Sequence, residues 1–287
     1  MADPDLVAEP LWPARHRGEH RQRFLRVWDL LAGAAAEVVA LVLPVECVCC
    51  GKEDLALCPG CERRLRMLTR HPFRAETGSP ALMDTDGSVI LPVVAAGIYR
   101  EELSQSILAF KRHGQGQLRS VLSKILAGAL AAAYSGTDRM VLVPVPTSAG
   151  AYRKRGFSPV HLLLAGAPWS VSSRHPDYLD ALCKVRNPRT GNSLGGQKGL
   201  GRGDRSRRVR GSMRSARGAR GRALRGRQCI IVDDVLTTGA TLAEAARAIH
   251  EAGGIVRGAV VLAATRPPDA AAVPAQSRQS GDRLGAS

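Results

Sequence analysis

Hydrophobic and polar positions follow two different patterns along this chain of 287 residues, and the change falls near residue 89. Before that point the pattern predicts an amphipathic helix over 24–43, then a cysteine cluster, a short basic helix over 62–70 and a linker over 71–88. After it, short apolar runs rich in β-branched residues alternate with segments that have the period of helices. This alternation is typical of an α/β fold with a mainly parallel sheet flanked by helices.

The strands and helices of the second part can be placed by their periodicity. We expect strands at 93–99, 140–145, 229–232 and 255–263, and helices at 101–110, 118–134, 156–165 and 242–250. Core residues are scarce from 186 to 227, where we expect a mobile, Arg-rich loop. Residues 1–23 and 267–287 have compositions typical of disordered ends.

The chain is strongly basic, with 41 Lys and Arg against 25 Asp and Glu and a formal net charge of +16. A basic balance favours acidic partners, such as phosphorylated substrates or nucleic acid. Eleven arginines lie within 202–227, where Asp204 is the single acid and no aromatic residue is present on which bases could stack. This run therefore leaves DNA binding open without indicating it.

Two features of the N-terminal region bear on location. The apolar stretch over 30–45 contains Glu37 and Pro44, and it is shorter than the span of about 20 residues that crosses a bilayer. Asp3 and Asp5 precede any basic cluster, unlike the start of a signal peptide. We therefore expect a cytoplasmic protein with reduced thiols and no membrane insertion.

Four cysteines form two pairs with metal-ligand spacing. Cys47 and Cys50 are separated by two residues, seven residues follow, and Cys58 and Cys61 repeat the first spacing. Four thiolates in this arrangement can close a structural zinc site, and in a cytosolic chain metal is favoured over disulfides. The alternative is a set of small buried hydrophobic cysteines. Cys49 could replace a neighbouring ligand or stay free.

The richest segment for chemistry combines a buried strand, two acids and a small polar loop before a helix. Asp233 and Asp234 follow the strand at 229–232, at the end of a strand where open α/β sheets place their ligands. The loop consists of Thr237, Thr238, Gly239, Ala240 and Thr241. Its backbone N–H groups lie at a helix N-terminus, which attracts phosphate. The segment predicts a sugar-phosphate site; a plain strand–helix junction would leave the acids and adjacent threonines unexplained.

Basic residues follow two other elements. Arg153, Lys154 and Arg155 come after the strand at 140–145 in what we expect to be a basic turn, where arginine could bind an anion with two hydrogen bonds. The alternative is a solvated turn. Lys111 ends the helix over 101–110, either as a favourable charge at the helix C-terminus or as a substrate contact.

Taken in order, these motifs resemble the ComF family of phosphoribosyltransferase-like proteins, which is associated with competence for DNA uptake. The resemblance rests on the cysteine cluster and on the segments IYREELSQSILAFKRHG, VPVPTSAGAYRKRGFSPVHLL, QKGLGRGDR and VDDVLTTGATL. The last segment is similar to the ribose-5-phosphate-binding motif of type I phosphoribosyltransferases. Two positions depart from the family pattern: Ser158-Pro159 replaces an Asn-Gln-like pair, and Ser206 replaces an Asn after Arg205.

The resemblance implies a type I phosphoribosyltransferase-like domain over 89–266, preceded by a zinc-ribbon-like module within 24–70. It implies binding of 5-phosphoribosyl 1-pyrophosphate (PRPP) with magnesium, or of a ribose-5-phosphate nucleotide, and transfer of the phosphoribosyl group to a nucleobase. Asp233 and Asp234 would be catalytic, and the loop 237–241 would bind the ligand together with Arg153 and Arg155. Thr237 stands where purine-type relatives have an acid, so a hypoxanthine or guanine acceptor is not expected.

Two other functions remain open from the sequence. The chain could be a non-catalytic accessory protein of DNA uptake or processing that binds single-stranded DNA or a competence helicase. It lacks a GxxxxGK[ST] motif, so it would not itself be the motor. Alternatively, the cysteine module, its helix and the basic loop could serve only a protein interface.

Overall fold

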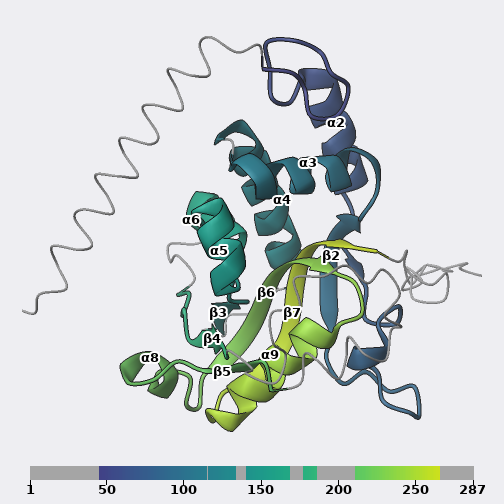
Figure 1. The fold of residues 1–287 in the computed structure, drawn as a ribbon. Coiled ribbons are helices and arrows are strands. Elements are labelled where there is room, and N and C mark those ends of the chain that lie inside the picture. The colour runs from purple at the N-terminus through teal and green to yellow at the C-terminus, as the bar shows by residue number, and fades with distance from the viewer. Residues whose placement is uncertain (1–44, 115, 134–139, 169–176, 186–210, 266–287) are drawn as a thin grey trace, which may run out of the picture. The chain divides into compact units, whose positions relative to one another are not determined.

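The computed structural model describes residues 45–114, 116–133, 140–168, 177–185 and 211–265 (Figure 1). By its contacts the chain divides into Met1–Val45 and Glu46–Ser287, and the description below concerns the second unit. The predicted helix over 24–43 and both predicted disordered ends lie outside the described residues.

The central sheet has five strands in the order β1-β2-β7-β6-β3. Its strands are β1 (Phe73–Arg74), β2 (Val93–Ile98), β3 (Met140–Pro144), β6 (Gln228–Leu236) and β7 (Ile255–Ala264). Neighbours among β2, β7, β6 and β3 are parallel, whereas β1 pairs antiparallel with β2 at one edge. The predicted α/β fold with a mainly parallel sheet is confirmed.

Helices surround this sheet. They are α2 (Pro59–Leu68), α3 (Glu101–His113), α4 (Gly116–Ala133), α5 (Ala149–Arg155), α6 (Pro159–Gly166), α8 (Ala219–Arg222), α9 (Ala240–Glu251) and the short 3₁₀ helix η1 (Pro80–Leu82). None of them, in the part of the chain that the structure describes, is long and apolar enough to cross a membrane.

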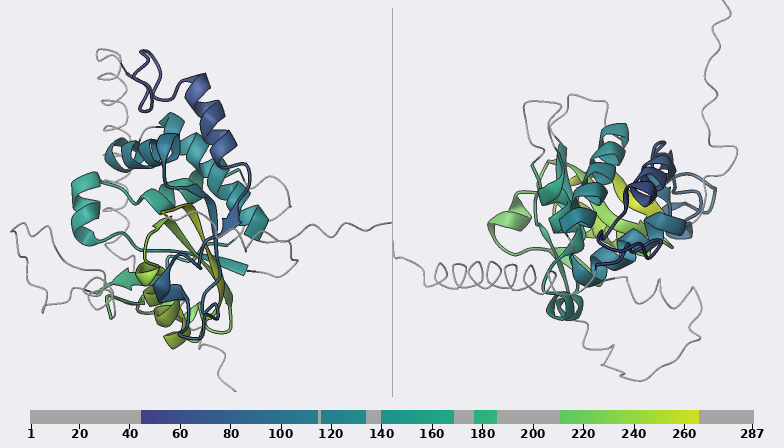
Figure 2. Two further views of the ribbon diagram at one scale, coloured as in Figure 1. Left: turned by 90° about the vertical axis from the view of Figure 1, so that its right-hand side faces the viewer. Right: turned by 90° about the horizontal axis from the view of Figure 1, so that it is seen from above.

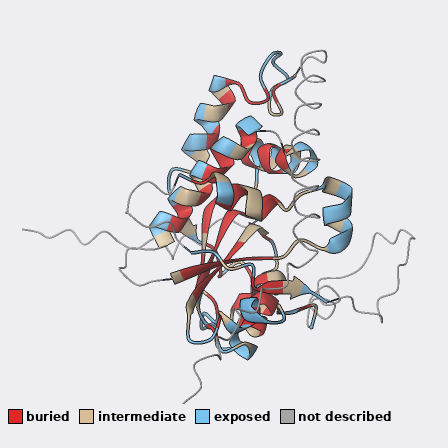
Figure 3. Ribbon diagram, turned by 90° about the vertical axis from the view of Figure 1, so that its left-hand side faces the viewer, coloured by how far each residue is buried: buried red, intermediate tan, exposed pale blue. Residues whose placement is uncertain are grey.

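The sheet is buried on both faces, because successive strand residues belong to different hydrophobic clusters. In β6, Ile230 and Val232 pack in the cluster that contains α2, α3, α4 and α6, whereas Cys229 and Ile231 pack in the cluster that contains α9. Figures 1 and 2 show α9 on the side of the sheet away from α3 and α4. In Figure 3 the strands are mostly buried and the helices expose one face. This burial explains the continuous apolar runs of the strands.

Three segments differ from the sequence-based expectation. The expected basic turn is helix α5, because the Ser148 side chain accepts a hydrogen bond from the Ala151 N–H and caps the first turn. The expected linker over 71–88 contains β1 and η1, and Glu76 and Leu82 within it are buried. Its short apolar groups have no regular period, so they could not be recognised as core.

The expected Arg-rich loop is partly folded. β4 (Leu182–Lys184) and β5 (Met213–Ser215) pair antiparallel, and α8 follows them, whereas 186–210 lie outside the described residues. The buried Glu244 of α9 accepts a hydrogen bond from the Met213 N–H, which fixes the two-stranded sheet beside α9.

Candidate functional site

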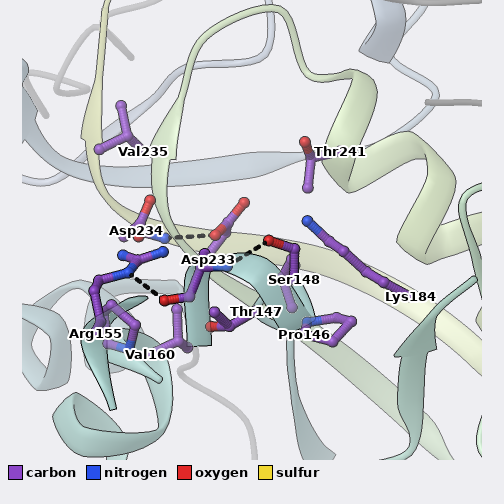
Figure 4. Close-up of a pocket in the computed structure, with 13 residues that line it drawn as sticks. Pro146, Thr147, Ser148, Arg155, Val160, Lys184, Asp233, Asp234, Val235 and Thr241 are labelled. Carbon is purple, nitrogen blue, oxygen red and sulfur yellow. Dashed lines mark hydrogen bonds between the residues drawn. The ribbon is translucent and has the colours of Figure 1, made fainter. Parts of the chain in front are cut away.

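A cavity of about 240 Å³ opens where β3 and β6 end (Figure 4). Its wall is formed by the loop 145–148 after β3, the helices α5 and α6, Lys184 of β4, the end of β6, and Thr241 of α9. Because the carboxyl ends of parallel strands meet at one edge of a sheet, this is the position at which α/β proteins bind ligands.

Asp233 and Asp234 lie in the last part of β6 and line the cavity. The strand is longer than predicted and includes both acids, since Asp233 still pairs with Val261 of β7. An Asp233 carboxylate oxygen accepts a hydrogen bond from the Asp234 N–H at 2.9 Å. Burial raises the pKa of Asp233 to about 7, and the charge of Asp234 adds to the effect; that N–H and the ammonium groups of Lys111 and Lys184 oppose it. The site therefore disfavours a second negative charge unless a cation compensates it.

Lys111 is the counter-ion of Asp234. Its Nζ lies 2.8 Å from the Asp234 Oδ1, and the two side chains are only 27% and 19% exposed. The last turn of α3 thus brings a cation to the end of β6. The sequence allowed two roles for Lys111, a favourable charge at the helix C-terminus or a substrate contact. The structure shows instead that Lys111 forms an ion pair with Asp234, which is predicted to be catalytic.

Arg155 and Lys184 are cations that line the cavity. Arg155 lies at the end of α5, where its Nε donates to the Ala151 carbonyl at 3.3 Å. Lys184 reaches the cavity from β4, and the sequence analysis missed it because a three-residue strand leaves almost no pattern. Of the two arginines predicted to bind ligand, the cavity wall includes Arg155 but not the exposed Arg153, both being in the described part of the chain.

The predicted phosphate loop leads into helix α9, and η1 packs against it. Gly239 has a φ of 77°, and a Cβ at this position would lie 2.4 Å from the Cγ of the buried Leu82. The Ala81 N–H donates to the Thr238 carbonyl at 3.4 Å, so η1 packs directly on the loop. Within the described residues Thr241 lines the cavity, whereas Thr237, Thr238, Gly239 and Ala240 do not. The N-terminal N–H groups of α9 have no partner within the helix, which leaves them available for an anion.

The four predicted cysteine ligands come together. The sulfurs of Cys47, Cys50, Cys58 and Cys61 all lie within 4.8 Å of one another. Tetrahedral zinc with Zn–S bonds of about 2.3 Å would place its ligands roughly 3.8 Å apart, so the cluster fits such an ion. Burial opposes ionisation of Cys47, but hydrogen bonds from backbone N–H groups, that of Cys58 first, lower its pKa to about 6. Burial raises the pKa of Cys61 instead, so the four thiols do not all favour the thiolate form that binds metal.

The cysteine cluster packs against α3. The Arg64 Nη2 donates to the Cys61 sulfur at 2.9 Å, and the same guanidinium forms an ion pair with Glu102 of α3. Cys49 lies outside the cluster of four: its sulfur is 3.8 Å from the Glu102 carbonyl and 3.8 Å from the Ser106 hydroxyl. Burial raises the pKa of Cys49 to about 11, so this thiol stays protonated.

Part of this site is similar to known proteins. The family model described as phosphoribosyl transferase domain matches residues 202–275, which include β6, both acids, the loop and α9. The orotate phosphoribosyltransferase of Methanopyrus kandleri is 59% identical over 39 residues, 14% of this chain and 21% of that protein. That of Pyrobaculum islandicum is 52% identical over 42 residues, 15% and 22% of the two chains. The chain thus spans about a fifth of the length of the curated relatives it matches.

Solved structures show lower similarity over more of the chain. The Mycobacterium tuberculosis orotate phosphoribosyltransferase in complex with PRPP is 16% identical, with 71% of this chain and 83% of that one covered and a TM-score of 0.31. A phosphoribosyltransferase from Corynebacterium diphtheriae is 15% identical, with the same coverage and TM-score.

Proposed function

We propose that this protein binds PRPP with magnesium and transfers its phosphoribosyl group to a nucleobase. One observation carries the proposal: the acids Asp233 and Asp234 line a cavity beside the start of α9, within the segment that matches the phosphoribosyl transferase domain. Arg155 and Lys184 add positive charge to the same wall. Paired acids for ribose hydroxyls, surrounded by cations and a helix N-terminus for phosphates, match the chemistry of PRPP.

Each part of PRPP has a matching part of the site. The loop 237–241 and the N-terminus of α9 would hold the 5-phosphate, and the carboxylates of Asp233 and Asp234 would accept hydrogen bonds from the ribose hydroxyls. The loop 146–148 with Arg155 and Lys184 would hold the pyrophosphate. The predicted contact of Arg153 is less favoured by its place outside the cavity wall.

Charge stabilisation is the main chemical task of these residues. When the bond from the ribose C1 to pyrophosphate breaks, positive charge develops on the sugar and negative charge on the leaving group. With PRPP bound as proposed, the two carboxylates would face the sugar, and Arg155 and Lys184 would face the pyrophosphate. A nitrogen of the acceptor base then forms the new bond to C1, so the protein need not supply a nucleophile.

Magnesium fits this site because both acids offer the hard oxygen ligands that it prefers. Burial and the charge of Asp234 raise the pKa of Asp233 to about 7, so a further cation beside the two acids would favour their ionised forms. Bound together with PRPP, magnesium would supply that charge and neutralise the pyrophosphate. For the cysteine cluster we propose structural zinc, since four protein thiols would fill the coordination shell.

Calorimetric titration of the zinc-loaded protein with magnesium and PRPP tests the proposal. The double variant Asp233→Asn/Asp234→Asn should lose binding. Arg155→Ala should weaken binding by about tenfold or more, the value of one charge-assisted hydrogen bond. Arg153→Ala is the matched control from the same helix and should change the affinity by less than about twofold. A folded wild type that does not bind PRPP, or equal losses in the two arginine variants, would refute the assignment.

Pyrophosphate release in the presence of nucleobases then tests turnover. Orotate is the first acceptor to try, because the two curated relatives are orotate phosphoribosyltransferases. PRPP binding without release for any base would identify a nucleotide-binding protein that has lost catalysis. Membership of the ComF family, a role in DNA uptake and a cytoplasmic location remain predictions; DNA affinity that falls steeply with salt would support the second.

A further inference from the structure

Two hydrogen bonds lead from the wall of the cavity to a histidine, and a carboxylate outside the cavity lies beside that histidine. Thr147 belongs to the loop after β3 and lines the cavity, and its Oγ1 lies 2.9 Å from the Ser158 Oγ. The Ser158 Oγ lies 2.8 Å from the His161 Nδ1, and the His161 Nε2 lies 3.3 Å from an oxygen of Asp180. These four side chains come from the loop after β3, the start of α6 and the segment before β4.

Ser158 occupies a helix N-cap position, but its side chain bonds to other side chains and not to the helix backbone. It is the N-cap residue of α6, where a serine hydroxyl ordinarily accepts a hydrogen bond from a backbone N–H of the first turn. Within the described part of the chain, the Ser158 side chain makes no such capping bond. Its hydroxyl instead lies between Thr147 and His161. The geometry therefore uses this serine to connect the histidine with the cavity.

Asp180 and Tyr178 flank the imidazole ring of His161. Asp180 faces the Nε2, and among the residues that the structure describes Arg220 also lies near that carboxylate, at 3.9 Å. The ring of Tyr178 meets the imidazole edge-on, with centroids 6.4 Å apart. From α4, Arg119 donates to the Leu162 carbonyl on the next residue of α6. Among these groups the carboxylate is nearest to the imidazole.

The direction of the hydroxyl protons depends on His161. When the Nδ1 carries no proton, it accepts from Ser158, Ser158 accepts from Thr147, and Thr147 presents only lone pairs to the cavity. When the Nδ1 is protonated, it donates to Ser158, Ser158 donates to Thr147, and the Thr147 hydroxyl is free to donate into the cavity. An anion bound there prefers the second arrangement, since it needs a donor rather than an acceptor.

We propose that His161 is a positioning residue that couples anion binding at Thr147 to the uptake of one proton. The inference rests on the proposed function, because it takes the pyrophosphate of PRPP as the anion. Binding orients the Thr147 hydroxyl toward the ligand, the two hydroxyl protons reverse their directions, and His161 takes a proton from solvent, which Asp180 compensates. Ser158 is the obligatory link, because it is the side chain that contacts both Thr147 and His161.

Proton uptake can be counted by titrating the full-length protein with magnesium and PRPP at pH 8 in two buffers of different ionisation enthalpy. We expect wild type to take up more protons than His161→Asn, by a difference approaching about one proton. The asparagine keeps a polar group near the Nδ1 position but does not titrate. Ser158→Ala should lose the same uptake although it retains the histidine, and Ser158→Thr should restore it. His71→Gln, at an exposed histidine, is the control.

Protons released by Asp233 or by the ligand are common to all these proteins. The difference in proton uptake between wild type and a variant therefore reports the relay formed by Thr147, Ser158 and His161. Above neutral pH the affinity of wild type should also fall by up to about tenfold per pH unit relative to His161→Asn. Equal proton uptake by wild type, His161→Asn and Ser158→Ala, with PRPP bound by all three, would refute the relay and leave the proposed function intact. A folded wild type that does not bind PRPP would refute both.

Discussion

Replacing Asp233 by Asn should stabilise the unliganded protein above neutral pH, although it should abolish PRPP binding. Burial raises the pKa of this carboxyl from 3.8 to about 7, and the neighbouring charge of Asp234 adds to it. Between about pH 4 and pH 7 the folded protein therefore holds a proton that the unfolded chain has released. The free energy of unfolding of wild type falls as the pH rises through this window and stays low above it.

The size of the effect follows from the pKa difference. A shift of about three pKa units corresponds to roughly 4 kcal/mol, which is the upper limit of the stabilisation at pH 8. The asparagine retains an oxygen that can accept the Asp234 N–H, but its amide remains a buried polar group. We therefore expect a gain of about 2 kcal/mol, or an unfolding midpoint higher by roughly 4–8 °C for a domain of this size.

Urea unfolding of both proteins at several pH values from 4.5 to 8, in steps of about half a unit, measures this difference. All other titrating groups are shared, so the difference between the two curves reports Asp233. Asp234→Asn is the comparison variant: it breaks the ion pair with Lys111, which costs about 1 kcal/mol, and it also removes the charge that helps to raise the pKa of Asp233. It should therefore gain less stability at pH 8 than Asp233→Asn does. A variant at Asp233 that is less stable than wild type at pH 8, or a difference that is the same at pH 5 and pH 8, would refute the reasoning.

Three further changes test other parts of the structure. Gly239→Ala should lower the free energy of unfolding by about 2 kcal/mol, because Gly239 has a φ of 77° and an added Cβ would meet Leu82. Gly128→Ala is the control: this glycine lies inside α4 with open space around it, so the change should raise the free energy of unfolding by about 0.5–1 kcal/mol. Equal effects of the two changes in urea unfolding would contradict the prediction. Glu244→Gln should lower the free energy of unfolding by about 3 kcal/mol, since it removes the buried carboxylate that pairs with Arg247. A loss below about 1 kcal/mol in urea unfolding would show that this ion pair contributes little to stability. Removal of the proposed zinc by a chelator should increase amide hydrogen exchange in α3 more than in α9, because α3 packs on the cysteine cluster. Equal increases in both helices would show that the metal stabilises the whole fold and not this contact.

Local patterns were enough to predict the main elements. The runs around Val93, Met140, Cys229 and Ile255 are buried on both faces, so they are continuously apolar and could be recognised one at a time. α3 and α9 have clear helical periods, and a glycine with positive φ follows the end of each helix, Gly114 after α3 and Gly253 after α9. The cysteine ligands are close in sequence, so their spacing alone predicted that they would meet.

Parts of the candidate site could not be predicted in this way. α5 was taken for a turn because its seven residues bury no side chain and leave no apolar stripe. Lys184 lies on a strand of three residues in a basic segment, where nothing distinguishes it from its neighbours. The separation of Arg155 from Arg153 depends on which side of α5 faces the cavity.

The sequence by itself determined the parallel α/β fold, the cluster of four cysteines and the position of Asp233 and Asp234 at a strand end, because each depends on residues close together in the chain. Only the tertiary structure decided which groups face those acids. Lys111 reaches Asp234 from α3, and Leu82 covers Gly239 from a segment taken for a linker. Such contacts depend on how separate elements pack, and that packing sets the burial and the charges that determine the chemistry of a carboxyl group.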